Sequence, residues 1–140
     1  MDFSFSEEQT LLRNTIQSFI QDNYDFDKRQ AIVKSEEGMK QENWKQFAEL
    51  GLLGLPFSEE DGGLNFGSVE TMIVAEEFGK GLVVEPYIQT VVTCGGFLRR
   101  ASASIKEKYI PGIISGEAVS YTHLRAHETS LHLVCRLLLE

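Results

Sequence analysis

The stretch from Gly51 to Gly67 constrains this 140-residue chain more than any other, because it cannot form a helix. Pro56 removes a backbone donor and favours an extended conformation at Leu55. Asp61-Gly62-Gly63 predicts a turn with a positive φ, which glycine adopts without steric cost. The remaining apolar residues of the stretch are Leu52, Leu53, Phe57, Leu64 and Phe66. We therefore expect a loop that packs against a core and separates two helical blocks. From the residues alone, a well-packed connector is its simplest interpretation.

Composition limits the classes of function that the chain can have. A formal net charge of −8 and a pI of about 4.9 argue against nucleic acid or an anionic membrane as partner. Cys94 and Cys135 are too few and too far apart to predict a disulfide scaffold or a zinc site. The acidic start, Met1 to Ser4, does not have the pattern of a secretory signal. We expect one compact cytoplasmic domain for most of the chain.

Apolar periodicity and capping residues predict an all-α fold of roughly six helices and no strand. Ser6 with Gln9 forms a capping box at the first of them. The expected helices cover residues 6–24, 25–34, 42–50, 68–78, about 86–100 and 102–109, and Ser68 is expected to cap the fourth. Pro111 is expected to open a separate last turn over residues 112–115. The lone Trp44 is expected in the core, and the Glu76-Glu77 pair on a solvated helix face.

Leu82 to Leu98 is the most apolar run of the chain. It is too short and too interrupted to cross a membrane, so we expect a helix that is buried on most sides. Gly95 and Gly96 each cost such a helix about 1 kcal/mol relative to alanine. Close packing or room for a ligand must offset that cost, and packing is the simpler explanation.

Four motifs in register carry a resemblance to a known family. They are Phe3 to Leu12, Phe47 to Gly63 with its Pro-Phe-Ser-Glu-Glu-Asp-Gly-Gly, Ala75 to Gly79, and Lys106 to Glu117. Together they resemble the N-terminal domain of the acyl-CoA dehydrogenases, which are FAD enzymes that desaturate acyl-CoA thioesters. Most members read Val-Pro-Glu-Glu-Tyr-Gly-Gly near the second motif, so the proline is slightly shifted here and Asp61 replaces the aromatic residue.

The resemblance implies an oxidoreductase in which a carboxylate removes the α-proton of the thioester while the β-hydride moves to the flavin. In the family, the base lies in a C-terminal helical domain, and most FAD contacts come from a β-domain. Neither region is expected within these 140 residues, so this stretch alone is predicted to be inactive. Glu59, Glu60, Glu76 and Glu77 match no family base, and no residue here is predicted to be catalytic, to bind FAD or to bind a metal.

The resemblance also implies where this domain touches acyl-CoA. In the family, the helix that corresponds to the Leu82–Leu98 run helps to wall the acyl-chain tunnel, and a Gln-Thr pair recurs near its start. Gln89, Thr90, Thr93 and Cys94 are the tunnel-lining candidates here. Cys94 has no activating His or Lys nearby in sequence, so a nucleophile role is not supported. We expect a homo- or hetero-oligomer with an electron-transfer partner of unknown identity.

From Val119 onward the chemistry of the sequence changes, and residues 119–140 contain all three histidines. Val119 to Thr129 corresponds to one reading frame of a transposase sequencing adapter, and Leu133 to Leu139 corresponds to an outer adapter. We therefore expect the family domain to cover residues 1–118 and residues 119–140 to be a non-native tail. A metal site at His123, His127, Glu128, His132 and Cys135 is the weaker alternative, because no recognised zinc spacing is present.

Two other functions stay open. The stretch Leu82 to Tyr87 is similar to subunits of heteromeric dehydrogenases that act on dicarboxylyl- or steroid-type acyl-CoAs, and some of these lack the base. The chain could alternatively be a non-enzymatic helical interaction module. A domain that belongs to a larger enzyme should expose an apolar patch centred on Leu82–Leu98, whereas a self-contained module should bury it.

Overall fold

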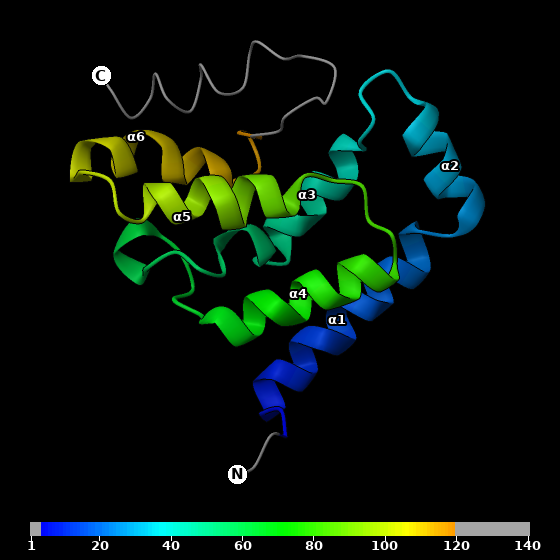
Figure 1. Ribbon diagram of the computed structural model, residues 1–140, viewed down its shortest axis with the longest axis horizontal. Coiled ribbons are helices and arrows are strands. Elements are labelled where there is room, and N and C mark those ends of the chain that lie inside the picture. The colour runs from blue at the N-terminus through cyan, green and yellow to red at the C-terminus, as the bar shows by residue number, and fades with distance from the viewer. Residues whose placement is uncertain (1–3, 120–140) are drawn as a thin grey trace.

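The computed structural model describes residues 4–119, and this part of the chain is entirely helical, without a strand (Figure 1). The elements are α1 (Glu7–Asn23), α2 (Phe26–Lys34), α3 (Gln41–Glu49), α4 (Ser68–Lys80), α5 (Gly95–Leu98) and α6 (Ala103–Ile114), the short 3₁₀ turns η1 (Leu52–Gly54) and η2 (Glu59–Asp61), and the π-helical segment η3 (Ile88–Cys94), which continues directly into α5. The prediction of an all-α domain with about six helices is confirmed. Between residues 4 and 119 no helix is long and apolar enough to cross a bilayer.

The predicted start of the first helix is confirmed by its hydrogen bonds, and that of the fourth is corrected. The capping box of α1 is formed, since the Gln9 backbone N–H donates to the Ser6 hydroxyl and the Ser6 N–H donates to the Gln9 side chain. The prediction that Ser68 caps α4 is wrong by one residue. Gly67 is the cap, and its backbone N–H donates to Glu70 Oε2 at 2.9 Å. The Glu70 carboxylate, three residues into the helix, therefore accepts a hydrogen bond from the backbone N–H of the cap residue.

The predicted separation of a helix ending at Tyr109 from a later turn is wrong. α6 runs without a break to Ile114 and contains Pro111. Proline costs the helix one backbone hydrogen bond. Ile110 and Ile113 flank Pro111 and are only 1% and 4% exposed, so their burial on the same helix offsets that loss.

A chain of aromatic rings joins the helices at the centre of the core. The Phe47 ring on α3 lies 5.1 Å from that of Phe19 on α1 and 4.8 Å from that of Phe78 on α4. Phe78 in turn meets Tyr87, at the start of the η3–α5 helix, edge to face at 5.2 Å. Trp44 is fully buried, as predicted. Four helices are thus held together by ring contacts, each with a favourable edge or stacked geometry.

The loop from Gly51 to Gly67 is packed into this core, as its apolar residues predict. Leu52, Leu53 and Phe57 have no exposed surface. The loop also folds back on itself, because the Leu64 N–H donates to Gly54 O, the Asn65 N–H to Phe57 O and the Phe66 N–H to Leu55 O, at 2.7 to 3.0 Å. Gly62 has the predicted positive φ, at +85°, and a Cβ on Gly63 would lie 2.3 Å from Phe57 O. The second glycine is therefore required by space and not by φ.

The Glu76-Glu77 pair corrects the prediction of a solvated face. Glu77 is only 2% exposed, because α4 packs against α1 at this point. Its carboxylate accepts hydrogen bonds from Gln17 at 3.0 Å and Lys80 at 2.9 Å, and Arg13 Nε lies 3.3 Å away. Glu76 stays largely exposed while it pairs with the same two cations, Arg13 and Lys80. Periodicity within α4 alone does not reveal that α1 supplies the partners of Glu77.

A second buried carboxyl, Glu85, lies in the connection that leads into the η3–α5 helix and is 5% exposed. Its Oε1 accepts from the Lys40 backbone N–H at 3.3 Å and from the Asn43 amide at 3.2 Å. Burial raises the pKa of Glu85 above its usual value, although the bond from the Lys40 backbone opposes that shift. Glu85 therefore fastens the entry of the η3–α5 helix to the first turn of α3.

Replacing Glu77 by alanine should lower the free energy of unfolding by about 1 to 3 kcal/mol, because Arg13 and Gln17 lose a buried partner. Burial by itself raises the pKa of Glu77, but hydrogen bonds from Lys80 and Gln17 outweigh it and hold that pKa below 4.5. The carboxylate thus stabilises the fold above that pH, and the effect of the substitution should shrink as the pH falls below it. Urea denaturation at pH 7 and pH 3 measures both the loss of stability and its dependence on pH. Glu76→Ala is the matched control, and an equal loss in the two variants would contradict the assignment.

Replacing Glu85 by glutamine should stabilise the protein at pH 7 and have little effect near pH 4. A raised pKa in the folded state means that wild-type stability falls as the pH rises above 4.5 through the folded-state pKa. Glutamine keeps the acceptor oxygen but carries no charge, so that decline should disappear. Glu85→Ala is the control, since it removes the acceptor and should cost about 1 to 3 kcal/mol near pH 4, and less at pH 7, where the wild type is itself less stable. Thermal melting from pH 4 to 8 measures these changes, and parallel curves for wild type and Glu85→Gln would refute the interpretation.

Candidate functional site

All four predicted site residues lie on the π-helical segment η3, Ile88–Cys94. Gln89 and Thr93 are exposed and lie four residues apart, so they share the outer side of the segment. Thr90 is fully buried and Cys94 is half-buried. The structure thus brings the four together on one element, but it divides them between an outer side and a core side.

The π-helical form of η3 is a feature that the sequence pattern did not reveal. The Gly95 backbone N–H donates to Thr90 O, five residues back, which is the bond that defines a wide turn. Such segments are rare and occur frequently at functional sites. The only sequence signal was the Gly95-Gly96 pair, which was expected to reflect packing. Packing explains Gly95, whose Cβ would lie 2.8 Å from the Phe57 ring, but not Gly96, where a Cβ would meet nothing within 4 Å.

The Gly51–Gly67 loop holds the η3–α5 helix at both ends. At the start, the buried Tyr87 hydroxyl donates to Leu52 O at 3.1 Å. Burial raises the pKa of Tyr87 above its usual value, so the phenol remains a donor at physiological pH. At the end, Arg99 Nη1 donates to Pro56 O at 3.2 Å. The loop therefore fixes the position of the residues between Tyr87 and Arg99.

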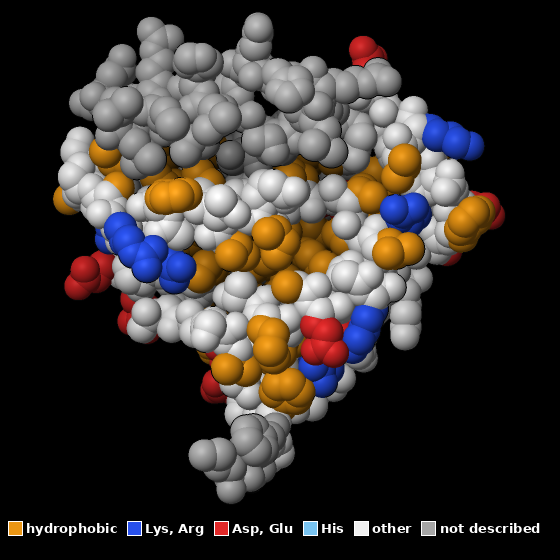
Figure 2. Space-filling model, viewed as in Figure 1, with side chains coloured by type: hydrophobic (Ala, Val, Ile, Leu, Met, Phe, Trp, Pro, Cys, Tyr) orange, Lys and Arg blue, Asp and Glu red, His pale blue; other side chains and the backbone are white. Residues whose placement is uncertain are grey.

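The outer side of this helix is partly apolar. Leu82, Ile88 and Phe97 are 60%, 44% and 54% exposed, and Val69 and Met72 on α4 are also exposed. Figure 2 shows hydrophobic side chains gathered between α4 and the η3–α5 helix on this face. This is the exposed apolar surface expected of a domain that belongs to a larger protein.

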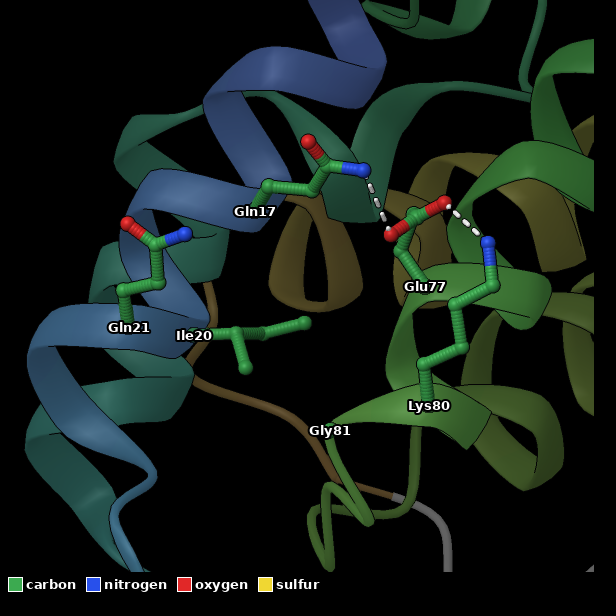
Figure 3. Close-up of a pocket in the computed structure, with 6 residues that line it drawn as sticks. All are labelled: Gln17, Ile20, Gln21, Glu77, Lys80 and Gly81. Carbon is green, nitrogen blue, oxygen red and sulfur yellow. Dashed lines mark hydrogen bonds and ion pairs between the residues drawn. The ribbon is translucent and has the colours of Figure 1, made fainter.

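A small cavity of about 160 Å³ lies between α1 and α4 and is lined by Gln17, Ile20, Gln21, Glu77, Lys80 and Gly81. Figure 3 shows Gln17 and Lys80 reaching Glu77 from opposite sides, so the carboxylate is already occupied by protein donors. A Cβ on Gly81 would lie 2.6 Å from Ile20, which shows how closely the two helices approach at the edge of the cavity. The cavity is therefore a polar seam between helices and offers no unpaired charge to a ligand.

Glu59 and Glu60, for which no catalytic role is predicted, are exposed and lie in η2. The neighbouring Ser58 hydroxyl donates to Asp61 Oδ2 at 2.7 Å, which closes this short turn. No group of three or more potential metal ligands is present within residues 4–119. His123, His127, Glu128, His132 and Cys135 lie outside the described residues, so the metal-binding alternative stays a prediction.

Comparison with known proteins identifies the family. The acyl-CoA dehydrogenase N-terminal domain matches residues 6–117. Isovaleryl-CoA dehydrogenase from Pongo abelii is 36% identical over 118 residues, which are 81% of this chain and 28% of the relative. A short-chain-specific acyl-CoA dehydrogenase from Clostridium acetobutylicum is 27% identical over 122 residues, which are 85% of this chain and 32% of the relative. The chain thus spans less than a third of the curated relatives it matches.

The fold agrees with that of solved structures. The ChsE4–ChsE5 complex from Mycobacterium tuberculosis aligns with a TM-score of 0.78 at 25% identity, over 85% of this chain and 33% of that chain. A variant of the Tcur3481–Tcur3483 steroid ACAD aligns with a TM-score of 0.74 at 24% identity, over 81% of this chain and 31% of that chain, and shows the fold alone. With the family match covering most of the described residues, the chain belongs to the acyl-CoA dehydrogenase family, and residues 6–117 correspond to its N-terminal domain.

Proposed function

We propose that this chain is the N-terminal helical domain of an FAD-dependent acyl-CoA dehydrogenase, and that η3 lines its acyl-binding site. The family match over residues 6–117 is the observation that carries this proposal. In this proposal, Gln89 and Thr93 contact the acyl group directly, while Thr90 and Cys94 lie behind them. No residue of this chain is proposed to be catalytic.

The surface chemistry of η3 supports a wall for an acyl chain. Gln89 and Thr93 are exposed polar side chains beside the exposed aliphatic Ile88. A binding wall of this kind combines apolar area, which an alkyl chain buries, with a few polar groups that fix orientation. Because the loop holds both ends of the helix, the wall is rigid before substrate arrives.

The cavity between α1 and α4 does not fit a flavin. The cavity between α1 and α4 is small, and its charged groups are paired with one another. We therefore assign FAD to other regions of the protein and derive no step of the reaction through it from this chain. The contribution of residues 4–119 is to shape the site and to carry surfaces on which other regions pack.

The proposed oligomeric state is based on the similar structures. Two similar structures each carry the names of two proteins, the ChsE4–ChsE5 complex and a variant of the Tcur3481–Tcur3483 steroid ACAD. We propose association into a homo- or hetero-oligomer, with a non-catalytic subunit as the alternative role.

Some relatives are mitochondrial enzymes, so the cytoplasmic location stays a prediction. We keep as a proposal that residues 119–140, which lie outside the family match over residues 6–117, are a non-native tail.

Replacing Thr93 by phenylalanine in the full-length protein should lower kcat/KM at least about tenfold for the longest acyl-CoA accepted, and less for butyryl-CoA. The added ring occupies the outer side of η3, where a long acyl chain would pass. Oxidation of butyryl-, octanoyl- and palmitoyl-CoA with an artificial electron acceptor measures the profile. Ser18→Phe, at an exposed position of α1, is the control.

That experiment tests the dehydrogenase function and the role of η3 separately. If the wild-type protein oxidises none of the three thioesters, the dehydrogenase function is contradicted for these substrates and the interaction module becomes the better explanation. If wild type is active and Thr93→Phe has the profile of Ser18→Phe, the enzyme assignment stands but η3 does not line the site.

A further inference from the structure

The position of Gly95 offers an inference about how the wall of the site is shaped, and it rests on the proposed function. Gly95 ends η3, is buried, and closes the wide turn through the bond from its N–H to Thr90 O. A Cβ there would lie 2.8 Å from Cζ and 3.3 Å from Cε1 of Phe57. Contacts under 3.0 Å essentially never occur at real Cβ atoms, so a side chain at this position must displace something.

The backbone and Cβ of Phe57 are held firmly, and its ring is buried. Phe57 is completely buried, and its backbone N–H donates to Gly54 O at 3.2 Å while its carbonyl accepts from the Asn65 N–H at 2.7 Å. On the other side, Gly63 lies so close that its own missing Cβ would fall 2.5 Å from Phe57 Cβ. A methyl group at position 95 would therefore move the helix and not the ring.

The register of η3 decides which side chains reach the outer side of the helix. An α-helix turns by about 100° per residue, so losing the extra residue of a wide turn rotates the residues before it by about that angle relative to those after it. Gln89 lies before the Gly95 bond and α5 lies after it. A change of register would thus rotate Gln89 away from its present relation to Phe97 and bring other side chains outward.

We propose that Gly95 is a specificity-determining position, at which the absence of a side chain lets Phe57 hold η3 in its π-helical register and so sets the shape of the acyl-binding wall. Gly95 is a positioning residue in this account, because it acts through Phe57 and the backbone of η3. The loop, which the sequence suggested was only a connector, acts here as the template for the wall.

The chain supplies a matched pair of variants for the test. Gly95→Ala introduces the clash, whereas Gly96→Ala places the same methyl where nothing lies within 4 Å. Both substitutions change helix propensity equally, so the pair separates the contact with Phe57 from propensity. Gly95→Ala with Phe57→Leu restores space next to position 95 and should return the wild-type behaviour in part.

In the full-length protein, Gly95→Ala should change the ratio of kcat/KM for palmitoyl-CoA to that for butyryl-CoA by about tenfold or more, and Gly96→Ala by less than about twofold. Crystal structures of the variants supply the second readout, whether the N–H of residue 95 still donates to Thr90 O. If Gly95→Ala does not fold, Phe57→Leu alone is measured, and it should change the ratio by loosening the same contact.

Three results would overturn the inference. The first is an equal substrate profile for Gly95→Ala and Gly96→Ala in an active enzyme. The second is a Gly95→Ala structure in which the bond to Thr90 O is unchanged. The third, used where Gly95→Ala cannot be prepared, is an unchanged kcat/KM ratio for Phe57→Leu, and all three leave the dehydrogenase function intact. A wild-type protein that oxidises no acyl-CoA would instead remove the proposed function on which the inference rests.

Discussion

The contact between Phe57 and its neighbouring glycines is the constraint on which the rest of the structure depends. Phe57 is buried on every side, and both Gly63 and Gly95 approach it more closely than a residue with a Cβ could. One of these glycines belongs to the same loop and the other to the η3–α5 helix. Gly63 lies against the backbone and Cβ of Phe57, and Gly95 lies against its ring. Phe57 therefore closes the loop and contacts the helix at the same time, so that a loop with only short 3₁₀ turns positions the most apolar helix of the chain.

This arrangement explains how a small helical domain can present a defined surface to the rest of a protein. The aromatic chain from Phe19 through Phe47 and Phe78 to Tyr87 ties α1, α3 and α4 to the start of η3. Buried carboxyl groups then fix particular contacts, Glu77 between α4 and α1 and Glu85 between the η3 connection and α3. Part of what stays exposed along η3 and α4 is apolar, as expected for a domain of the acyl-CoA dehydrogenase family that spans less than a third of its relatives.

The sequence predicted the helical fold well, because the signals that define it are local. The capping box of Ser6 and Gln9 and the turn at Gly62 depend on residues within one or two turns, and the structure confirms both of them. The errors came where distant residues decide. Glu77 is buried because α1 supplies its partners, and α6 continues through Pro111 because Ile110 and Ile113 are buried.

The candidate site was located by family resemblance and not by any local pattern. Gln89, Thr90, Thr93 and Cys94 lie on one segment, but periodicity within the segment could not show that it is π-helical or that its last turn lies against Phe57. Glycine at positions 95 and 96 looked equivalent in sequence, and only the structure separates them. The roles of the four residues stay a prediction.

Native-state hydrogen exchange on this chain tests most directly whether the loop is as firmly structured as the helices that it joins. Our account predicts that the amides of Asn65 and Gly95 exchange with the same free energy of opening as the amide of Phe47 in α3, because the loop and the π-helical segment open only when the whole core unfolds. Opening of Asn65 and Gly95 at a clearly lower free energy than Phe47 would contradict it. In that case the loop would be a separate, weaker unit, and it could not serve as the template for the helix.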